Sequence, residues 1–407
     1  MGVLEVLRQR RFRWLAAART AGYLGNAIAP IALAFAVLDL TGSVTDLGIV
    51  VGARSVANVA LLLVGGVLAD RLPRAVLLQG ASLAAALTAG VLATAVLGGF
   101  ASVPLLAGVG LVNGAVSAVS LPAAAAITPE TVPAGVLQQA NAVVRMGTNT
   151  ASVAGSASGG LLAALTGPGW AMAVTAVIFL VEAGCYLRVG RGDRPAARSR
   201  VRPLAELREG WSEFVSRTWV WVVVVQFMVV NAAVVGGLHV LGPAIADDTI
   251  GRTAWGFALA AETAGALIGG VLAARWLPRR ALGFGVALTS VIAVPLLLLA
   301  HGPSVVVLLV VMFAAGVGLE QFTIAWDLSL QQNVPGDRLA RVYSYDMVGS
   351  FVAVPIGQLV AGPVAVAVGT SATLTGAAVL IVAATAAALL SGQVRGLRRL
   401  EVTEPAP

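Results

Sequence analysis

The sequence predicts an all-α membrane protein in which twelve transmembrane helices form two pseudo-symmetric bundles of six. Three observations predict this fold class: a very apolar composition, twelve apolar runs of spanning length, and an internal repeat. Only 11% of the 407 residues are charged and 58% are hydrophobic, whereas a soluble domain carries about 25% charged residues. Because so few charges cannot cover a surface that faces water, we expect most of the surface to face lipid.

The apolar runs supply the helices. A spanning helix needs about 20 apolar residues, and the Gly, Pro, Asp and Ser clusters between the runs are typical of tight connections. The first run follows an arginine-rich start but is too long for the core of a signal peptide, so we expect it to be the first membrane helix. The twelve runs cover residues 14–38, 47–69, 75–98, 103–127, 139–165, 169–189, 219–243, 253–274, 281–300, 304–328, 340–365 and 368–390.

The basic residues indicate how the helices are oriented. All 26 are arginines, and if the N-terminus is cytoplasmic, 22 of them fall in cytoplasmic segments and one, Arg252, in an outer segment. Cytoplasmic loops are enriched in basic residues, so we expect both termini in the cytoplasm. The lysine-free, alanine-rich composition indicates a bacterial cytoplasmic membrane protein. Charges at helix ends also explain the net charge of +7 without a nucleic-acid partner.

An internal repeat divides the chain. The sequence Gly-Gly-Val-Leu-Ala at 65–69 returns at 269–273, and Val-Pro at 132–133 returns at 334–335. Three glycines in each half follow at an offset of 202 residues. Two such halves in the same orientation enclose a midplane cavity, which rocking of one half against the other exposes to each side in turn.

The repeat sets the expected domains. We expect six-helix bundles over 1–189 and 219–407, joined by a cytoplasmic linker over 190–218. Apolar side chains of the linker share one helical face, which predicts a short amphipathic helix at the membrane interface, acting as a tether. That face consists of Leu204, Leu207, Trp211, Phe214 and Val215.

The connection between the second and third runs reads Gly66-Val-Leu-Ala-Asp70-Arg71-Leu-Pro-Arg74. It resembles the signature loop of the major facilitator superfamily, with proline where that loop has its second glycine. The resemblance implies that superfamily's fold and secondary transport by alternating access. It also implies a latch in which Asp70 faces the start of the eleventh helix and favours the outward-facing state. For Arg71 and Arg74, pairing with acids and a purely topogenic role both stay open.

Glycines of the fifth helix resemble a motif of drug:proton antiporters, with Ser156 where the motif has proline. Close helix packing explains most of these small residues. Residues 327–350 are similar to a bacterial exporter subgroup associated with drug or siderophore efflux. The glycine motif comprises Gly147, Gly155, Gly159 and Gly160, with Pro355, Gly357 and Gly362 at the repeat-related place in the eleventh helix.

Ionisable side chains inside spanning helices are costly and are therefore candidate functional groups. Glu262 and Glu320 are the first candidates for a carboxylate that binds a proton or the substrate, and Arg54 and Arg145 provide counter-charge. Snorkelling or structural pairing is the simpler explanation for charged groups nearer the helix ends. These are Arg19, Glu182, Asp327 and Asp346.

Two asparagines, Asn26 and Asn231, lie at the depth expected for a central cavity. An amide at such a position can contact a ligand or bond to a neighbouring helix. Both explanations stay open for each residue.

These features favour a secondary active transporter, most simply a proton-coupled exporter of hydrophobic or amphipathic compounds. A facilitator for a small metabolite and a non-transporting sensor of the same fold are the alternatives. We expect no enzyme, cofactor or metal site, because the chain has no nucleophile elbow, no lysine for a nucleotide-binding loop, one cysteine and two histidines. The expected partners are a small molecule, protons and the lipid bilayer, with the protein as a monomer.

Overall fold

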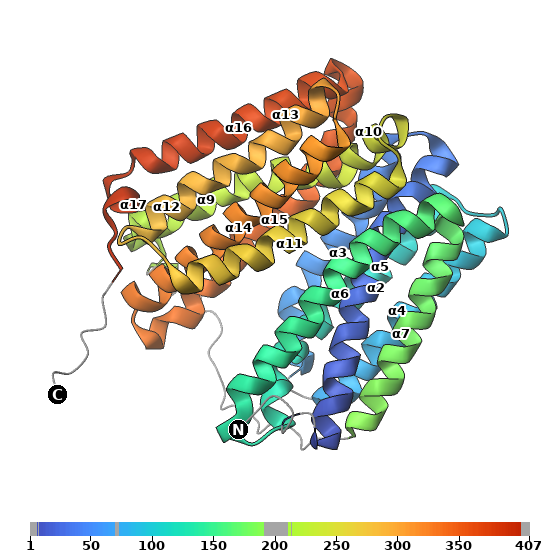
Figure 1. Ribbon diagram of the computed structural model, residues 1–407, viewed down its shortest axis with the longest axis horizontal. Helices are drawn as coiled ribbons and strands as arrows, with labels where there is room; N and C mark the ends of the chain where they lie inside the picture. Colours follow the sequence, from blue (N-terminus) through green and yellow to red (C-terminus); the bar gives the residue numbers. More distant parts are fainter. Residues whose placement is uncertain (1–5, 7, 70–72, 191–210, 213, 400–407) are drawn as a thin grey trace. The chain divides into compact units, whose positions relative to one another are not determined.

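The computed structural model describes residues 6, 8–69, 73–190, 211–212 and 214–399. A helix covers each of the twelve apolar runs (Figure 1). The first six are α2 (Arg10–Thr41), α3 (Val44–Ala69), α4 (Arg74–Leu97), α5 (Val103–Ala126), α6 (Leu137–Leu165) and α7 (Pro168–Val189). The remaining runs correspond to α9 (Thr218–Val234) with α10 (Gly242–Asp248), α11 (Arg252–Arg275), α12 (Ala281–Leu288) with α13 (Ala293–His301), α14 (Val305–Asn333), α15 (Gly336–Val368) and α16 (Thr370–Leu390).

Within the described chain, eleven helical stretches are long and apolar enough to cross a membrane. The helix that falls short is α6. Its first turns carry polar side chains at Gln138, Gln139, Asn141 and Arg145, which lower its hydropathy. Three of these side chains, Gln138, Asn141 and Arg145, are exposed.

Two of the helical runs are interrupted, and a proline follows each interruption. A π-helical turn (Val235–Leu241) joins α9 to α10, which has Pro243 in its first turn. A 3₁₀ turn (Thr289–Ile292) joins α12 to α13 just before Pro295. Proline lacks an N–H and its ring clashes with the carbonyl four residues earlier, so the regular α-helical hydrogen bonds change at these points.

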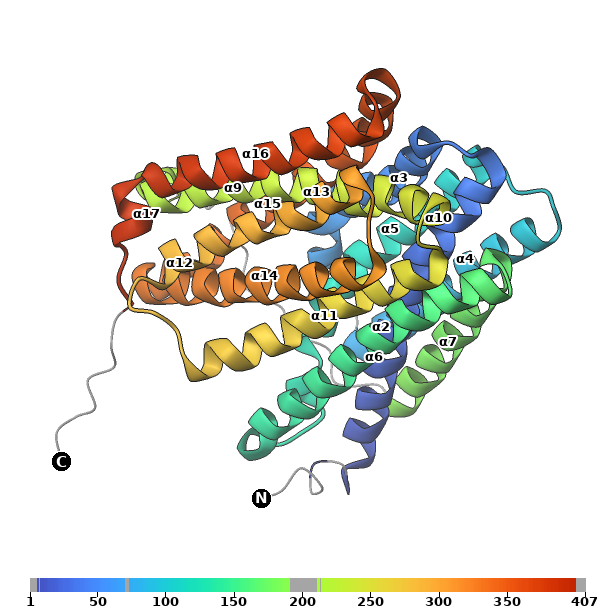
Figure 2. The same ribbon diagram turned by 45° about the horizontal axis from the view of Figure 1, so that its top comes forward.

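The chain divides into two compact units, which we describe separately. Unit 1 contains residues 1–199, 238–260 and 358–366. Within it α3 packs along α5, α4 along α7, and α2 between α6 and α7 (Figures 1 and 2). Residues buried in its core include Phe12, Leu15, Leu78, Ile127 and Tyr186.

Unit 2 contains residues 200–237, 261–357 and 367–407. Here α12 packs on α14, while α16 packs on α9 and α13. Aromatic pairs fill its core. The rings of Phe227 and Phe322 stack 4.8 Å apart, and those of Trp219 and Trp326 meet edge to face at 5.7 Å. Of the expected amphipathic linker helix, most lies outside the described residues; its end contributes Trp211 and Phe214, which stack at 5.7 Å.

The repeat extends to helix packing. In unit 1, Gly114 of α5 lies against the backbone carbonyl of Arg54 in α3. In unit 2, Gly316 of α14 lies against the backbone carbonyl of Glu262 in α11. The two glycines are 202 residues apart, which is the offset of the repeat. Arg54 and Glu262 therefore make the same kind of contact with a glycine of the facing helix, although they are 208 residues apart and the 204-residue offset of these two helices pairs Arg54 with Ala258.

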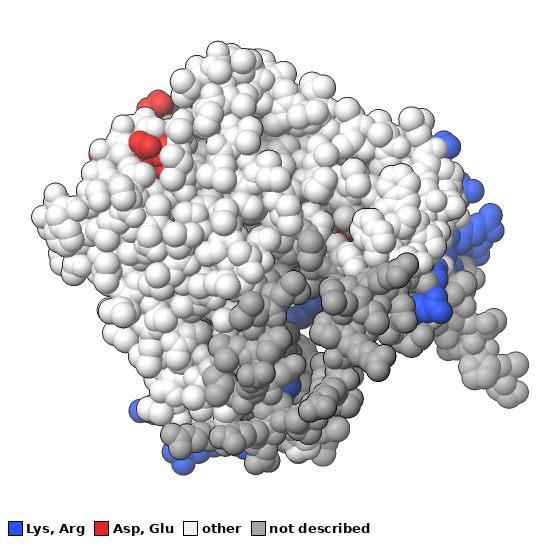
Figure 3. All heavy atoms as spheres, turned by 180° about the vertical axis from the view of Figure 1, so that it is seen from behind, with Lys and Arg blue, Asp and Glu red and all other residues white. Residues whose placement is uncertain are grey.

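The surface agrees with a lipid environment. Figure 3 shows large uncharged areas of the described surface, with most visible arginine atoms near the right and lower edges, a few near the centre, and acidic atoms at the upper left. Many large apolar side chains are exposed to the surroundings, among them Leu87, Val306 and Leu390. Such a surface is stable against hydrocarbon rather than water.

Candidate functional site

A cavity of about 460 Å³ lies inside unit 1, among α2, α3, α4, α5 and α7. Its walls are mostly apolar, with side chains such as Leu78, Ala85, Val116 and Phe179. Polar side chains from all five helices also reach the lining, and such groups fix the orientation of a bound small molecule. The main ones are Arg19, Asn26, Arg54, Ser82, Asn113 and Glu182.

Arg54 enters the cavity from α3 and is held by one defined hydrogen bond. Its Nε donates to Oδ1 of Asn113 at 2.8 Å. The Asn113 amide in turn donates to Oγ1 of Thr88 at 3.3 Å. This chain of contacts across α3, α5 and α4 fixes the plane of the guanidinium group while its terminal nitrogens lie at the cavity wall.

Glu182 enters the same cavity from α7. Its carboxylate lies close to the Ser82 side chain, whose hydroxyl donates to the Leu78 carbonyl at 2.9 Å, and it interacts with the charge of Arg19. The Arg19 guanidinium also lies 5.4 Å from the centre of the Tyr23 ring. Arg19 and Glu182 thus form an opposite-charge pair inside the first bundle.

Sequence reasoning did not single out this pair as a site, because each residue lies near the end of its apolar run. A signal was available in the spacing. Arg19, Gly22, Tyr23 and Asn26 recur at intervals of three and four residues, as do Glu182 and Tyr186 on α7. Residues so spaced share one face of a helix.

The predicted candidates separate into two groups. Arg54 and Asn26 line the cavity of unit 1, and the Asn26 amide donates to the Gly22 carbonyl at 2.8 Å. Arg145 is exposed on α6. In unit 2, the Asn231 amide donates to the Ser350 carbonyl at 3.2 Å, joining α9 to α15.

The two predicted carboxylates lie in unit 2. Glu262 is partly buried in α11, and among the described residues its carboxylate has no hydrogen-bond or ion-pair partner. Glu320 extends from α14 towards α11, where its Oε1 lies 3.8 Å from the position that a Cβ on Gly270 would take.

The glycine motif has a clear packing role. A Cβ added to Gly155 would lie 2.7 Å from the Leu24 carbonyl of α2, and one added to Gly160 would lie 2.7 Å from the Gly256 Cα of α11. The same holds at the repeat-related positions: a Cβ on Gly357 would lie 2.8 Å from the Ala232 Cα, and one on Gly362 2.6 Å from the Thr45 Cα. Gly147 and Gly159 likewise lie close to Thr20 and Ile28, and Pro355 is buried.

The signature loop is described only at its ends. Gly66 belongs to α3, and Arg74 begins α4 with an ion pair to Glu130. Asp70 and Arg71, with the expected latch, lie outside the described residues.

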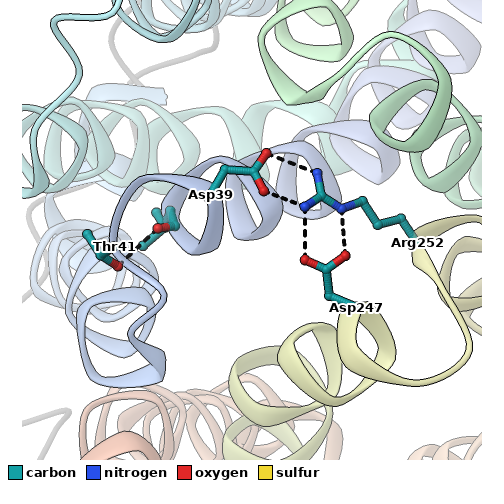
Figure 4. A network of polar contacts seen from close by, with 5 residues as sticks. Asp39, Thr41, Asp247 and Arg252 are labelled. Carbon is teal, nitrogen blue, oxygen red and sulfur yellow. Dashed lines mark hydrogen bonds and ion pairs between the residues drawn. The ribbon is translucent and has the colours of Figure 1, made fainter.

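A charged cluster of unit 1 joins helices that are distant in sequence (Figure 4). Arg252 at the start of α11 pairs with Asp39, near the end of α2, and with Asp247 in α10. Its Nε and Nη2 donate to Asp247 at 2.8 and 2.9 Å, and its Nη1 donates to Asp39 at 3.0 Å. The guanidinium also lies 4.8 Å from the Phe35 ring centre.

Comparison with known proteins identifies the family. A sequence profile of the Major Facilitator Superfamily matches residues 15–358. The chain belongs to the major facilitator superfamily. This superfamily consists of multi-pass membrane transporters rather than enzymes, so the protein is a secondary transporter that takes a small molecule as its substrate.

Solved structures of transporters show the same fold. A bacterial homologue of the human lysosomal transporter Spinster, inward-facing and unoccupied, has a TM-score of 0.70 at 15% identity and covers 97% of this chain and 99% of its own. The nucleoside transporter NupG scores 0.76 at 15% identity over 93% of this chain and 98% of its own. A point variant of it scores 0.77 at 13% identity, covering 93% and 99%. No curated protein sequence matches the chain.

The comparisons confirm the predicted fold class and the superfamily resemblance. The twelve-helix architecture expected from the apolar runs is the architecture of these transporters.

Among the described residues there is no group of three or more His, Cys, Asp or Glu side chains arranged to hold a metal ion.

Proposed function

We propose that this transporter exports amphipathic small molecules from the bacterial cytoplasm in exchange for protons. The observation that carries the coupling is Glu262. It is a carboxylate in a spanning helix without a partner among the described residues. An unpaired charge at such a depth is costly, so a proton on this group is the simplest way to neutralise it. A carboxylate that is protonated in one state and releases the proton in another couples proton movement to the conformational change.

Position supports the same role. Like Arg54, Glu262 lies where the backbone of its helix meets a glycine of the facing helix, about one helical turn beyond the position that the 204-residue offset pairs with Arg54. Arg54 faces a cavity. Because the helix contacts are similar, we expect Glu262 to face the interior of the second bundle as well. Glu320, one helix away on α14, is the second candidate for the proton.

The remaining elements of the proposal come from the sequence. The arginine bias supports cytoplasmic termini, with bundles over 1–189 and 219–407 rocking about the linker 190–218. Asp70 would latch the cytoplasmic side, as the signature loop implies. Efflux is favoured by the exporter-like glycine motif, and amphipathic compounds by the largely apolar cavity of unit 1, which also carries polar groups.

The test measures proton movement driven by substrate. The full-length protein is placed in liposomes that contain a pH-sensitive dye, a proton gradient is imposed, and amphipathic compounds are added. We expect at least one compound to collapse the gradient with the wild-type protein and with Asp248→Asn, an exposed acid at the end of α10. We expect no collapse with Glu262→Gln.

Other results of this experiment would identify one of the alternative functions. Compounds that cross without moving protons identify a facilitator. Equal proton movement by the wild type and by both Glu262→Gln and Glu320→Gln contradicts the assignment of these carboxylates. A wild-type protein that moves no compound in either direction favours a sensor.

A further inference from the structure

The charges that line the cavity of unit 1 are not balanced. The lining contains two cations, Arg19 and Arg54, and one acid, Glu182. Glu182 interacts with the charge of Arg19. Even with Glu182 ionised, the cavity therefore retains one net positive charge, and that charge belongs to Arg54.

Arg54 has no acidic partner among the described residues. Its one hydrogen bond is to the neutral amide of Asn113 through Nε. This contact orients the guanidinium but leaves the fork of the two terminal nitrogens available at the cavity wall. An arginine in a spanning helix is normally paired or solvated, since an unpaired charge there is costly. An unpaired one beside a cavity is therefore a candidate binding group.

We propose that the cavity of unit 1 binds the anionic group of an amphipathic organic molecule, with Arg54 as the residue that recognises it. The guanidinium fork matches the geometry of a carboxylate, sulfonate or phosphate. The apolar walls at Leu78, Val116 and Phe179 accommodate the organic part. A volume of about 460 Å³ suits a molecule of one or two rings rather than an inorganic ion.

This inference rests on the proposed transport function, because it names the class of substrate. Two sources supply such a group: a soluble organic anion, or the headgroup of an anionic lipid. Both use the same chemistry at Arg54, and the experiment below separates them.

The test is binding to the full-length protein in nanodiscs of phosphatidylcholine, without a gradient. The probes are 2-naphthoate, 2-naphthylmethanol and 2-naphthylmethylamine, which share an apolar ring system and differ in charge. We expect the wild type to bind the carboxylate at least about ten-fold more tightly than the alcohol, the range for hydrogen bonds to charged groups. Arg54→Gln should remove this preference and leave binding of the alcohol unchanged. The matched control Arg275→Gln, an exposed arginine in the last turn of α11, should behave as the wild type.

A second pair of variants keeps the test decisive if Arg54→Gln does not fold. Arg54→Lys keeps the charge but loses the fork, and Asn113→Ala removes the acceptor that orients it. Each should retain part of the preference. Equal binding of the three probes by the wild type overturns the proposal, as does an anion preference that survives in Arg54→Gln.

Changing the lipid composition of the nanodisc distinguishes a lipid headgroup from a soluble anion as the natural ligand. If phosphatidylglycerol in the nanodisc weakens naphthoate binding to the wild type, the headgroup occupies the site; if it has no effect, the site is for soluble anions. Either result supports the anion site. Because binding needs no gradient, an anion site that stands while Glu262→Gln still moves protons would refute only the proposed coupling.

Discussion

Removal of the Arg252 side chain should loosen the contact that joins α2, α10 and α11 in unit 1. Arg252→Gln deletes the ion pairs with Asp39 and Asp247 and the contact with the Phe35 ring. The Arg252 side chain is 19% exposed, but Asp39 and Asp247 are 41% and 31% exposed. Each pair is therefore partly screened and contributes about 0.2–1 kcal/mol, and the ring contact about 0.5–1 kcal/mol. The total of about 1–3 kcal/mol corresponds to roughly a 5- to 150-fold change in the equilibrium between closed and open forms of this contact.

The assay is the rate at which a cysteine at position 246 reacts with a membrane-impermeant maleimide. Ala246 precedes Asp247 in α10 and is buried, and Cys185, the single native cysteine, is first replaced by alanine. We expect Arg252→Gln to raise the labelling rate within the stated range, and Arg252→Lys to raise it less. High salt should bring the wild-type rate towards that of Arg252→Gln, because the carboxylates are accessible to screening ions. An unchanged rate in Arg252→Gln would refute the view that the cluster holds these helix ends together.

Two further predictions concern packing. Gly114→Ala and Gly316→Ala should each destabilise the purified protein by about 1–3 kcal/mol, because the added methyl meets a carbonyl of the facing helix. The measurement is the melting temperature, read by size-exclusion chromatography after heating. The control Gly90→Ala, with open space around it, should leave the melting temperature unchanged. Gln226→Leu should cost about 0.6–1.7 kcal/mol, since it removes hydrogen bonds from Nε2 to Thr289 and Thr385 at 2.9 and 3.3 Å. A melting temperature equal to that of the wild type would show that the two threonines, 3.0 Å apart, suffice alone.

Much of the fold was accessible from the sequence, because a membrane leaves few choices. Spanning segments must satisfy their own backbone hydrogen bonds, so each long apolar run could only be a helix. The repeat was also visible, since the glycines that allow close backbone contact cannot be exchanged for larger residues. The interruptions before Pro243 and Pro295 were less evident: proline marks the place, but the neighbours decide whether a π or a 3₁₀ turn forms there.

The site was only partly accessible. Arg54 was recognised because a charge in an apolar run is conspicuous, yet its position at a cavity depends on Asn113, which comes from a different helix. Arg19 and Glu182 are 163 residues apart in the chain, and nothing local indicates that α2 and α7 bring them together. Depth along a helix can be estimated from sequence, but the face that a residue presents to its neighbours depends on the packing.

The equivalent glycines at 114 and 316 have a consequence for how such a transporter diversifies. Each holds the neighbouring helix by a main-chain carbonyl and so fixes the backbone at 54 or 262 without regard to the side chain there. The charged side chain at each of these two positions can thus be substituted while the fold is conserved. In this chain one position carries a cation, Arg54, and the other an acid, Glu262. We therefore expect single substitutions of the side chains at 54 and 262 to leave the packing of the surrounding helices unchanged.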